Sequence, residues 1–334
     1  MTDAEEFAGR TAPFRRELLA HCYRMLGAVD EAEDLVQETY LRAWRSYAGF
    51  AGRSSLRVWL YRIATNVCLT ALEQRGRRAI PSGLGGPGAP PDPAGPGVAW
   101  LQPIPDALVT PESADPAAIV AARESVRFAL IAGLQWLPPR QRAVLVLREV
   151  LAFPADEVAA MLDMTTAAVK SMLQRARARL DEAAPQPQEC SEPTDPHARM
   201  LLEQYVAGFE RADVAALERA LRTDAAIELV GTRAWFSGRD TCLRFLAGVI
   251  GAPGRWRMVP TVANGQPAAA AYERGGDGIH RAFGLGVLTT TGAGIARILV
   301  FGGGADLVAG FGLPQELRAE PRAEPAAAVT VEGR

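Results

Sequence analysis

Hydrophobic and polar positions follow a helical period through the first half of the chain. Apolar residues recur at steps of three and four from Asp30 to Tyr47, and again from Leu56 to Val67. The segment from Thr166 to Leu180 repeats this spacing. Each pattern lays one apolar stripe along an α-helix. We therefore predict all-helical blocks over residues 10–78 and 116–182.

The last third of the chain has a different pattern. A helical stretch around Met200 to Phe209 precedes shorter apolar runs that glycine and proline residues bound. These runs are typical of strands and cover residues 225–230, 256–262, 268–272, 284–290 and 294–301. A leading helix followed by several strands predicts an α+β domain over residues 197–317.

Segments rich in proline and glycine separate these blocks. Residues 79–115 contain the dense Pro/Gly run from Pro81 to Pro96, which cannot sustain a long helix or strand. Residues 183–196 form a second predicted linker, and the tail 318–334 has the composition of a disordered segment.

Composition excludes several classes of protein. Hydrophobic residues make up 49 % of the chain, charged residues 22 %, and the net charge is −2. The sequence has neither a signal-like start nor an apolar run long enough to span a membrane, so we expect a cytoplasmic protein with no membrane partner. The four cysteines are scattered without C-x-x-C spacing or a histidine cluster, so we expect neither a metal site nor a cofactor.

An acidic stripe accompanies the first apolar one. Asp34, Gln37 and Glu38 lie on one side of the predicted helix, a pattern that on spacing alone is typical of a solvated surface. The surrounding segment Ala32–Trp44 resembles region 2.2 of the sigma-70 family. This resemblance implies that Asp34, Leu35, Gln37 and Glu38 bind RNA polymerase core, at the clamp of its largest subunit.

The next helix is basic and aromatic. Its segment Phe50–Cys68 resembles regions 2.3 and 2.4 of the extracytoplasmic-function (ECF) sigma factors, in which the −10 strand of promoter DNA is opened and read. The resemblance implies −10 contacts by six residues, namely Phe50, Arg53, Ser55, Arg62, Thr65 and Asn66. Trp59 and Tyr61, taken alone, are more typical of packing than of base stacking.

A helix-turn-helix is predicted near the middle of the chain. Leu137–Arg148 resembles the start of sigma region 4, and a helix after Pro154 is followed by a turn at Asp163 that requires a left-handed backbone. The second helix has one apolar and one basic face, as a major-groove recognition helix needs. The expected −35 contacts are Thr165, Thr166, Ala167, Lys170, Ser171, Gln174, Arg175 and Arg177. The alternative for such a helix is an ordinary solvated basic face.

The apolar motif Trp100–Leu108 lies within the first linker. It resembles a motif of the sigma-G-type subfamily of ECF factors. Two interpretations remain open: insertion into the polymerase channel, or docking on the third block of the same chain.

The third block resembles the cone-shaped SnoaL-like fold, which is related to polyketide cyclases and nuclear transport factor 2. The segments Arg199–Leu217, Trp235–Asp240 and Val262–Ala268 carry this resemblance. It implies a pocket for an unknown small-molecule ligand, with Trp235, Tyr272 and His280 as candidate lining residues. Because the sequence offers no convincing acid–base pair, we expect a regulatory domain and no catalysis.

The combined pattern is typical of a sigma factor that directs transcription initiation under the control of an attached domain. The fold prediction is two all-α sigma domains followed by an α+β domain. The alternative is a ligand-sensing helix-turn-helix regulator, which would leave the acidic stripe and the basic aromatic helix without a role. An enzyme with a DNA-binding appendage is the third interpretation.

Overall fold

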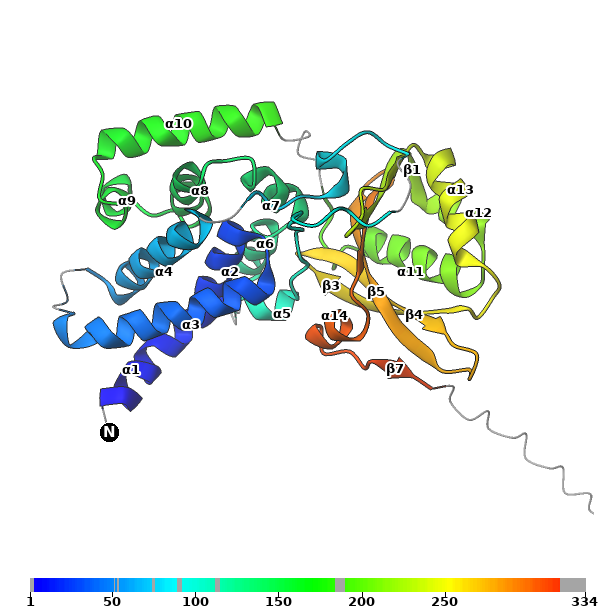
Figure 1. The fold of residues 1–334 in the computed structure, drawn as a ribbon, viewed down its shortest axis with the longest axis horizontal. Coiled ribbons are helices and arrows are strands. Elements are labelled where there is room, and N and C mark those ends of the chain that lie inside the picture. The colour runs from blue at the N-terminus through cyan, green and yellow to red at the C-terminus, as the bar shows by residue number, and fades with distance from the viewer. Residues whose placement is uncertain are drawn as a thin grey trace, which may run out of the picture.

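The computed structural model describes residues 3–50, 52, 54–73, 76–88, 92–111, 115–183 and 190–318. Two lobes lie side by side in Figure 1: a helical lobe from the first half of the chain and a sheet lobe from the last third. Arg53, residues 184–189 of the second predicted linker, and residues 319–334 of the tail lie outside the described residues.

Four helices form the first part of the helical lobe. They are α1 (Asp3–Thr11), α2 (Arg15–Leu26), α3 (Val29–Ser46) and α4 (Leu56–Glu73). The predicted apolar stripes face one another, so that Val36, Ala43, Leu60 and Ala64 are buried against α2. Gly27 ends α2 in a left-handed conformation, which lets the chain reverse directly into α3.

The second part of this lobe contains the predicted helix-turn-helix. Its helices are α6 (Pro116–Glu124), α7 (Phe128–Leu134), α8 (Pro139–Leu145), α9 (Ala155–Met161) and α10 (Thr166–Ala183), and a π-helical turn over Val146–Val150 extends α8. Asp163 adopts φ 51°, the left-handed backbone that the sequence required between α9 and α10.

The segment between these two parts lies against both lobes. Its described residues include a 3-10 turn (Pro81–Gly83) and the short helix α5 (Asp106–Val109). Leu101 and Ile104 are almost fully buried. Pro105 forms an isolated bridge with Ala263 of the sheet lobe. Of the two interpretations left open, the structure therefore shows the motif Trp100–Leu108 docked on its own chain.

The sheet lobe is α+β, as predicted. Its strands are β1 (Leu221–Val230), β2 (Trp235–Ser237), β3 (Trp256–Ala263), β4 (Gln266–Arg274), β5 (His280–Thr291), β6 (Gly294–Gly302) and β7 (Glu316–Leu317), in the order β2-β1-β6-β5-β4-β3 with β7 on β5. All pairs are antiparallel except β1 with β6. The lobe's helices are α11 (Pro196–Glu210), α12 (Val214–Ala220), α13 (Arg239–Ile250) and α14 (Gly304–Gly310).

The two faces of this sheet have different partners. On one face, Leu288 and Ile298 pack with Leu201 and Tyr205 of α11 in a core that belongs to the domain alone. The other face belongs to the core of the helical lobe, where Phe301 stacks on Phe128 with ring centroids 5.2 Å apart. The third domain is therefore part of one folded body with the helical lobe.

Candidate functional site

Helix α3 presents the predicted polymerase-binding residues. Asp34 and Gln37 are exposed, while Leu35 and Glu38 are half-buried. Glu38 pairs with Arg42 one turn later at 2.7 Å. Leu41 and Trp44 extend the same surface with 51 % and 41 % of their side chains exposed. Figure 1 shows α3 in the lower part of the helical lobe, with α1 below it.

Leu41 and Trp44 lie on the same helix as the acidic stripe, and the ring of Trp44 packs edge-on against Phe7 with centroids 5.3 Å apart. Sequence reasoning did not single out Leu41 and Trp44. The periodicity placed Trp44 among the core positions, because the apolar stripe on α3 is wider than the part that the fold buries.

The predicted −10 residues on and before α4 divide into exposed and buried groups. Ser55 and Asn66 are exposed. Phe50 packs on Trp59, with ring centroids 4.8 Å apart. Arg62 is half-exposed and forms an ion pair with Asp163 in the helix-turn-helix, at 3.2 Å. Arg53 lies outside the described residues.

Thr65 points inward. Its side chain is fully buried, and its hydroxyl lies 3.0 Å from Nε2 of His21. Burial, with a further contribution from the nearby Arg24, lowers the pKa of His21 to about 3, so the ring is neutral at physiological pH. Thr65 and Asn66 are neighbours in the sequence, but they lie on different faces of α4: Thr65 is buried and Asn66 is exposed. The hydrogen bond between Thr65 and His21 holds α4 against α2.

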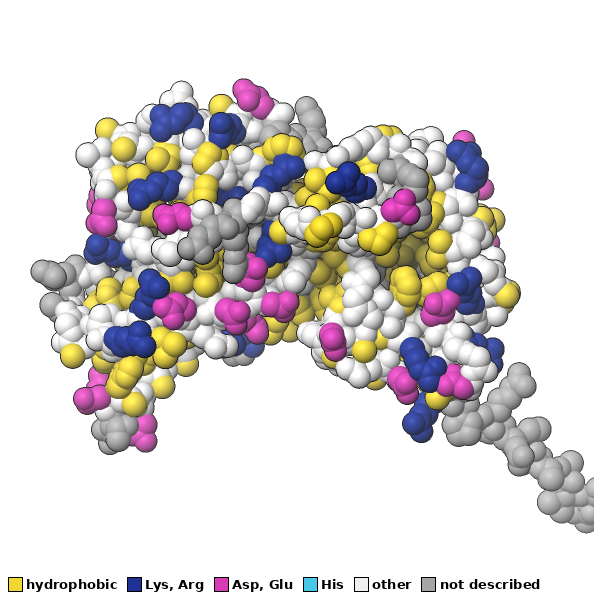
Figure 2. Space-filling view, viewed as in Figure 1, with side chains coloured by type: hydrophobic (Ala, Val, Ile, Leu, Met, Phe, Trp, Pro, Cys, Tyr) yellow, Lys and Arg dark blue, Asp and Glu magenta, His cyan; other side chains and the backbone are white. Residues whose placement is uncertain are grey.

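Helix α10 and the preceding Thr165 present all eight predicted −35 residues at the surface. The hydroxyl of Thr165 accepts a hydrogen bond from the backbone N–H of Ala168 at 3.1 Å and so caps the helix start. Val169 and Ala176 are buried beneath it. Arg175 donates to Ser171 at 2.9 Å, and Arg177 pairs with Glu149. Figure 2 shows basic side chains along the upper edge of the lobe, where Figure 1 places α10.

Helix α4 also packs against the helix-turn-helix. Phe153 forms an edge-on contact with Tyr61, with ring centroids 5.1 Å apart. The guanidinium of Arg57 lies over both rings, 5.1 Å from the centroid of Tyr61 and 4.6 Å from that of Phe153. Arg142 of α8 is buried and donates hydrogen bonds to the carbonyl of Met25 in α2 and to Gln135. The helices predicted to contact the −10 and −35 elements therefore belong to parts of the chain that are in direct contact.

The tip of the β3–β4 hairpin binds both halves of the helical lobe. Asn264 is fully buried, and its amide donates to the Tyr23 hydroxyl and to the carbonyl of Val126, each at 2.7 Å. Its side-chain oxygen accepts from the N–H of Ile104 at 2.9 Å. Because every group of this amide has a partner, its burial costs little and joins three distant segments of the chain.

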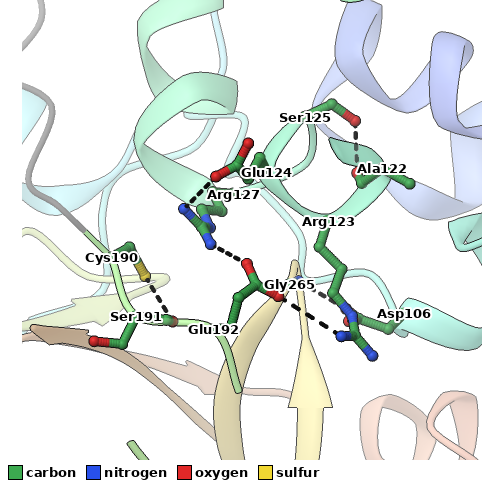
Figure 3. Close-up of polar contacts among 10 residues, drawn as sticks. All are labelled: Asp106, Ala122, Arg123, Glu124, Ser125, Arg127, Cys190, Ser191, Glu192 and Gly265. Carbon is green, nitrogen blue, oxygen red and sulfur yellow. Dashed lines mark hydrogen bonds and ion pairs between the residues drawn. The ribbon is translucent and has the colours of Figure 1, made fainter. Parts of the chain in front are cut away.

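A charged cluster continues the junction beside the hairpin tip (Figure 3). The N–H of Gly265 donates to Asp106 at 2.7 Å, and Asp106 also lies 3.3 Å from Arg123. Glu192 pairs with both Arg123 and Arg127. Gly265 has φ +65°, and a Cβ there would approach the Arg123 carbonyl to 2.7 Å, so this tip requires glycine.

Comparisons with known proteins agree with this architecture. The family model "Sigma-70 region 2" matches residues 12–78, and "Sigma-70, region 4" matches residues 127–180. The chain is 48 % identical over 320 residues to the ECF RNA polymerase sigma factor SigG of Mycobacterium tuberculosis, covering 93 % of this chain and 85 % of the mycobacterial protein. This chain belongs to the ECF sigma factors.

A second relative extends the comparison. The ECF sigma factor SigJ of Mycobacterium tuberculosis is 29 % identical over 71 % of this chain and 70 % of its own length. The crystal structure of SigJ superposes on this sigma factor with a TM-score of 0.57 at 24 % identity, over 94 % of this chain and all of SigJ. The fold of the helical lobe with its attached sheet domain is thus shared. As a member of this family, the sigma factor binds RNA polymerase core and promoter DNA to initiate transcription.

The candidate pocket residues of the sigma factor lie apart from one another. Trp235 lines a cavity between the two lobes. Tyr272 is buried and donates to the carbonyl of Pro314 at 2.8 Å. His280 lies at the start of β5, where its Nε2 is 3.1 Å from the carbonyl of Gly254. The structure brings no two of these three residues together.

Other ionisable groups that enzymes of this fold class could use are also engaged. Glu228 is buried and paired with Arg297, while Asp277 pairs with Arg281 on an exposed hairpin turn. Within the described ranges no group of histidine, cysteine and acidic residues could hold a metal ion, and no helix is both long and apolar enough to span a membrane. The four cysteines are free thiols.

Sequence reasoning missed the junction residues Asn264, Tyr23 and Asp106. Asn264-Gly265 between two apolar runs is a strong signal for a tight hairpin turn. That signal locates the turn, but nothing local indicates that its amide reaches a tyrosine 241 positions earlier in the chain.

Proposed function

We propose that this sigma factor is held in a closed arrangement by its C-terminal domain and opens to bind a promoter. In the closed arrangement, α3 offers its exposed face (Asp34, Leu35, Gln37 and Glu38) to the clamp of polymerase core. The −10 and −35 readers are in contact with each other and must separate. The C-terminal domain acts through contacts, without catalysis.

The observation that carries this proposal is the ion pair between Arg62 and Asp163. Its 3.2 Å distance joins the −10 helix to the turn before the −35 helix. The two promoter elements are centred about 25 base pairs apart, which is about 85 Å of B-DNA at about 34 Å per helical turn. The closed chain cannot contact both elements. Released from its docking contacts, the 79–115 segment reaches on the order of 120 Å at ~3.3 Å per residue, so it can span them.

The residue assignments follow from exposure. On α10, we propose that Thr166, Ala167 and Lys170 approach the −35 bases and that Arg175 and Arg177 contact phosphates. On the −10 side, Phe50, Ser55, Arg62 and Asn66 remain candidate DNA contacts, and Arg53 is proposed on the resemblance alone. Thr65 holds the helix in position.

The C-terminal domain favours the closed form because Asn264 contacts both sigma regions and the linker. Removing its amide leaves buried partners without hydrogen bonds, at a cost of about 1–3 kcal/mol for each group. The variant Asn264→Ala therefore shifts the chain toward the open form.

The experiment is transcription in vitro with purified polymerase core and a pool of bacterial promoters. We expect Asn264→Ala to bind core as the native chain does and to initiate more often. Asn264→Asp is the matched variant. It keeps the acceptor for the Ile104 N–H but loses the two donated hydrogen bonds, so it should also initiate more often than the native chain. Equal initiation by all three chains, at equal core affinity, would show that the junction has no inhibitory role. A native chain that never binds core would contradict the clamp assignment.

A further inference from the structure

A cavity of about 340 Å³ lies where three parts of the chain meet. The segment 77–83 after α4 forms one wall, α7 and its end at Trp136 form a second, and the outer face of the sheet forms the third. In Figure 2 the surface is hollowed between the two lobes, with apolar side chains along the hollow. The volume falls in the range of small-molecule sites, which start at about 300 Å³.

The lining of this cavity is cationic. Four arginines contribute to it and none of its lining residues is acidic. Three of them have carboxylate partners outside the lining: Arg78 pairs with Glu31, Arg127 with Glu192, and Arg297 with Glu228. The fourth, Arg77, forms no ion pair with any residue that the structure describes.

Arg77 is held in place without a counter-charge. Its guanidinium lies 3.4 Å from the centroid of the Trp136 ring, and Nη2 donates to the carbonyl of Gly83 at 3.2 Å. Nη1 is buried and has no hydrogen-bond partner among the described residues. Burial lowers the pKa of this guanidinium, which is the direction expected for a cation that lacks compensation.

The remaining walls are aromatic and apolar. Trp136, Trp235, Phe128 and Leu299 contribute side chains. Two polar residues of the sheet, Gln266 and Thr289, form the floor of the cavity. The Gln266 side chain already has hydrogen-bond partners: it donates to Thr289 at 3.0 Å and accepts from the N–H of Phe128 at 3.1 Å. The floor therefore offers no free polar group to a ligand. Among the described lining residues, Nη1 of Arg77 and Nε of Arg127 are buried without a hydrogen-bond partner. Arg127 already has carboxylate partners in Glu124 and Glu192, so Arg77 is the lining cation without a counter-charge.

We propose that this junction cavity binds a small amphipathic anion, which consists of one acid group on an aromatic or short acyl body. Arg77 is the counter-ion, and the two tryptophans pack against the apolar body. The site is separate from the other face of the sheet, where Tyr205, Phe209 and Leu217 fill the space beneath α11 and α12. Because three separate segments build the walls, the ligand binds only the assembled junction and stabilises it.

The probes are decanoate, decyl phosphate, 1-decanol and inorganic phosphate, added to the full chain without polymerase. Calorimetry gives the affinity, and the fluorescence of Trp136 and Trp235 reports occupancy of the site. We expect one saturable site for decanoate or decyl phosphate, weaker binding of decanol and no binding of inorganic phosphate. The two acids distinguish a carboxylate from a phosphate head group.

Two variants locate the site. Arg77→Gln should weaken the better acid by about tenfold, as expected when one charge-assisted hydrogen bond is removed, and leave decanol unchanged. The control Arg244→Gln alters an exposed arginine of α13 that contacts only Thr241 in the described structure. Ala132→Phe places a ring in the cavity and should abolish binding of acids and alcohol alike. Circular dichroism melts confirm that each variant folds.

Three outcomes would overturn the proposal: no saturable acid binding, equal losses in Arg77→Gln and Arg244→Gln, or undiminished binding in Ala132→Phe. Binding of inorganic phosphate as tight as that of the acids would overturn the amphipathic class. These measurements need no polymerase, so a chain that binds acid but not core would contradict only the proposed function.

Discussion

The two helices that we expect to read promoter DNA, α4 and α10, have the same length and different surroundings. Both are amphipathic and begin after a hydroxyl side chain; α4 carries two arginines and α10 carries three. The outer face of α10 is fully exposed, whereas α4 has Thr65 buried and Arg62 paired with the helix-turn-helix. Figure 1 shows α10 along the outer edge and α4 beneath α8 and α9. In the proposed closed form, the helix expected to read the −35 element is exposed, and the helix expected to read the −10 element is in contact with the helix-turn-helix.

The largest expected effect comes from disrupting binding to polymerase core, because both helices reach promoter DNA only after that step. Reversing Asp34 and Glu38 to lysine places like charges opposite the proposed basic clamp surface, and we expect core affinity to fall by about 100-fold. Equilibrium binding to purified core measures this. The same double reversal at Glu203 and Asp240, two exposed acids of the C-terminal domain, should leave affinity unchanged. Equal affinity for both double variants would move the core-binding surface away from α3.

The next prediction concerns a variant that should expose α4 to DNA as fully as α10. A methyl group at Gly265 meets the Arg123 carbonyl and sits at a strained φ of +65°, so Gly265→Ala should undock the hairpin tip. We expect energy transfer between dyes on α4 and α10 to fall, and promoter binding to rise by about tenfold, for a shift of about 1–2 kcal/mol. Gly254→Ala is the control: it places a methyl group at a similarly strained φ of +78°, but the methyl group meets no atom within 4 Å. Similar behaviour of the two variants would mean that strain alone, rather than docking, produces the change.

A smaller effect compares the two helices directly. Removing one phosphate contact reduces the slope of log affinity against log salt by about 1, whatever the DNA sequence. We expect Arg175→Ala on α10 to show this reduction in the native chain. Arg62→Ala should show it only in the Gly265→Ala background, because the closed chain occupies Arg62. Equal slopes for Arg62→Ala in both backgrounds would break the comparison.

The smallest effect concerns the buried bond that turns Thr65 inward. The pKa of His21 is about 3 in the folded chain, against an ordinary value of 6.5, so the unfolded chain binds the proton first as pH falls. Its contribution to stability is complete above pH 6.5 and is lost progressively toward pH 3. We expect the free energy of unfolding to drop by about 1 kcal/mol between pH 6.5 and 5.5. Urea titrations should show a shallower pH dependence for His21→Gln, and an unchanged dependence would refute this account.

The sequence predicted the helices and strands better than the contacts that these elements make with one another. Hydrophobic period located α3, α4, α10 and the five long strands, and the requirement at Asp163 located the turn. It missed β2, β7 and α14, which are short. It also missed α13, although Cys242, Leu246 and Ile250 recur at a helical spacing along that helix. The exposure of Leu41 and the burial of Thr65 both depend on which neighbour each helix meets. The junction around Asn264 joins segments that no local pattern relates.

If the C-terminal domain closes the chain as proposed, its place on the same chain fixes its stoichiometry. Every molecule of this sigma factor holds one copy, at an effective concentration set by chain connectivity, which is in the millimolar range for short tethers. Reclosure is therefore a first-order event that neither dilution nor higher expression changes. A cell that makes more of this protein multiplies the closed and open forms in the same ratio. The open fraction then changes through binding of core and promoter or through an event at the junction, and not through the amount of the protein itself.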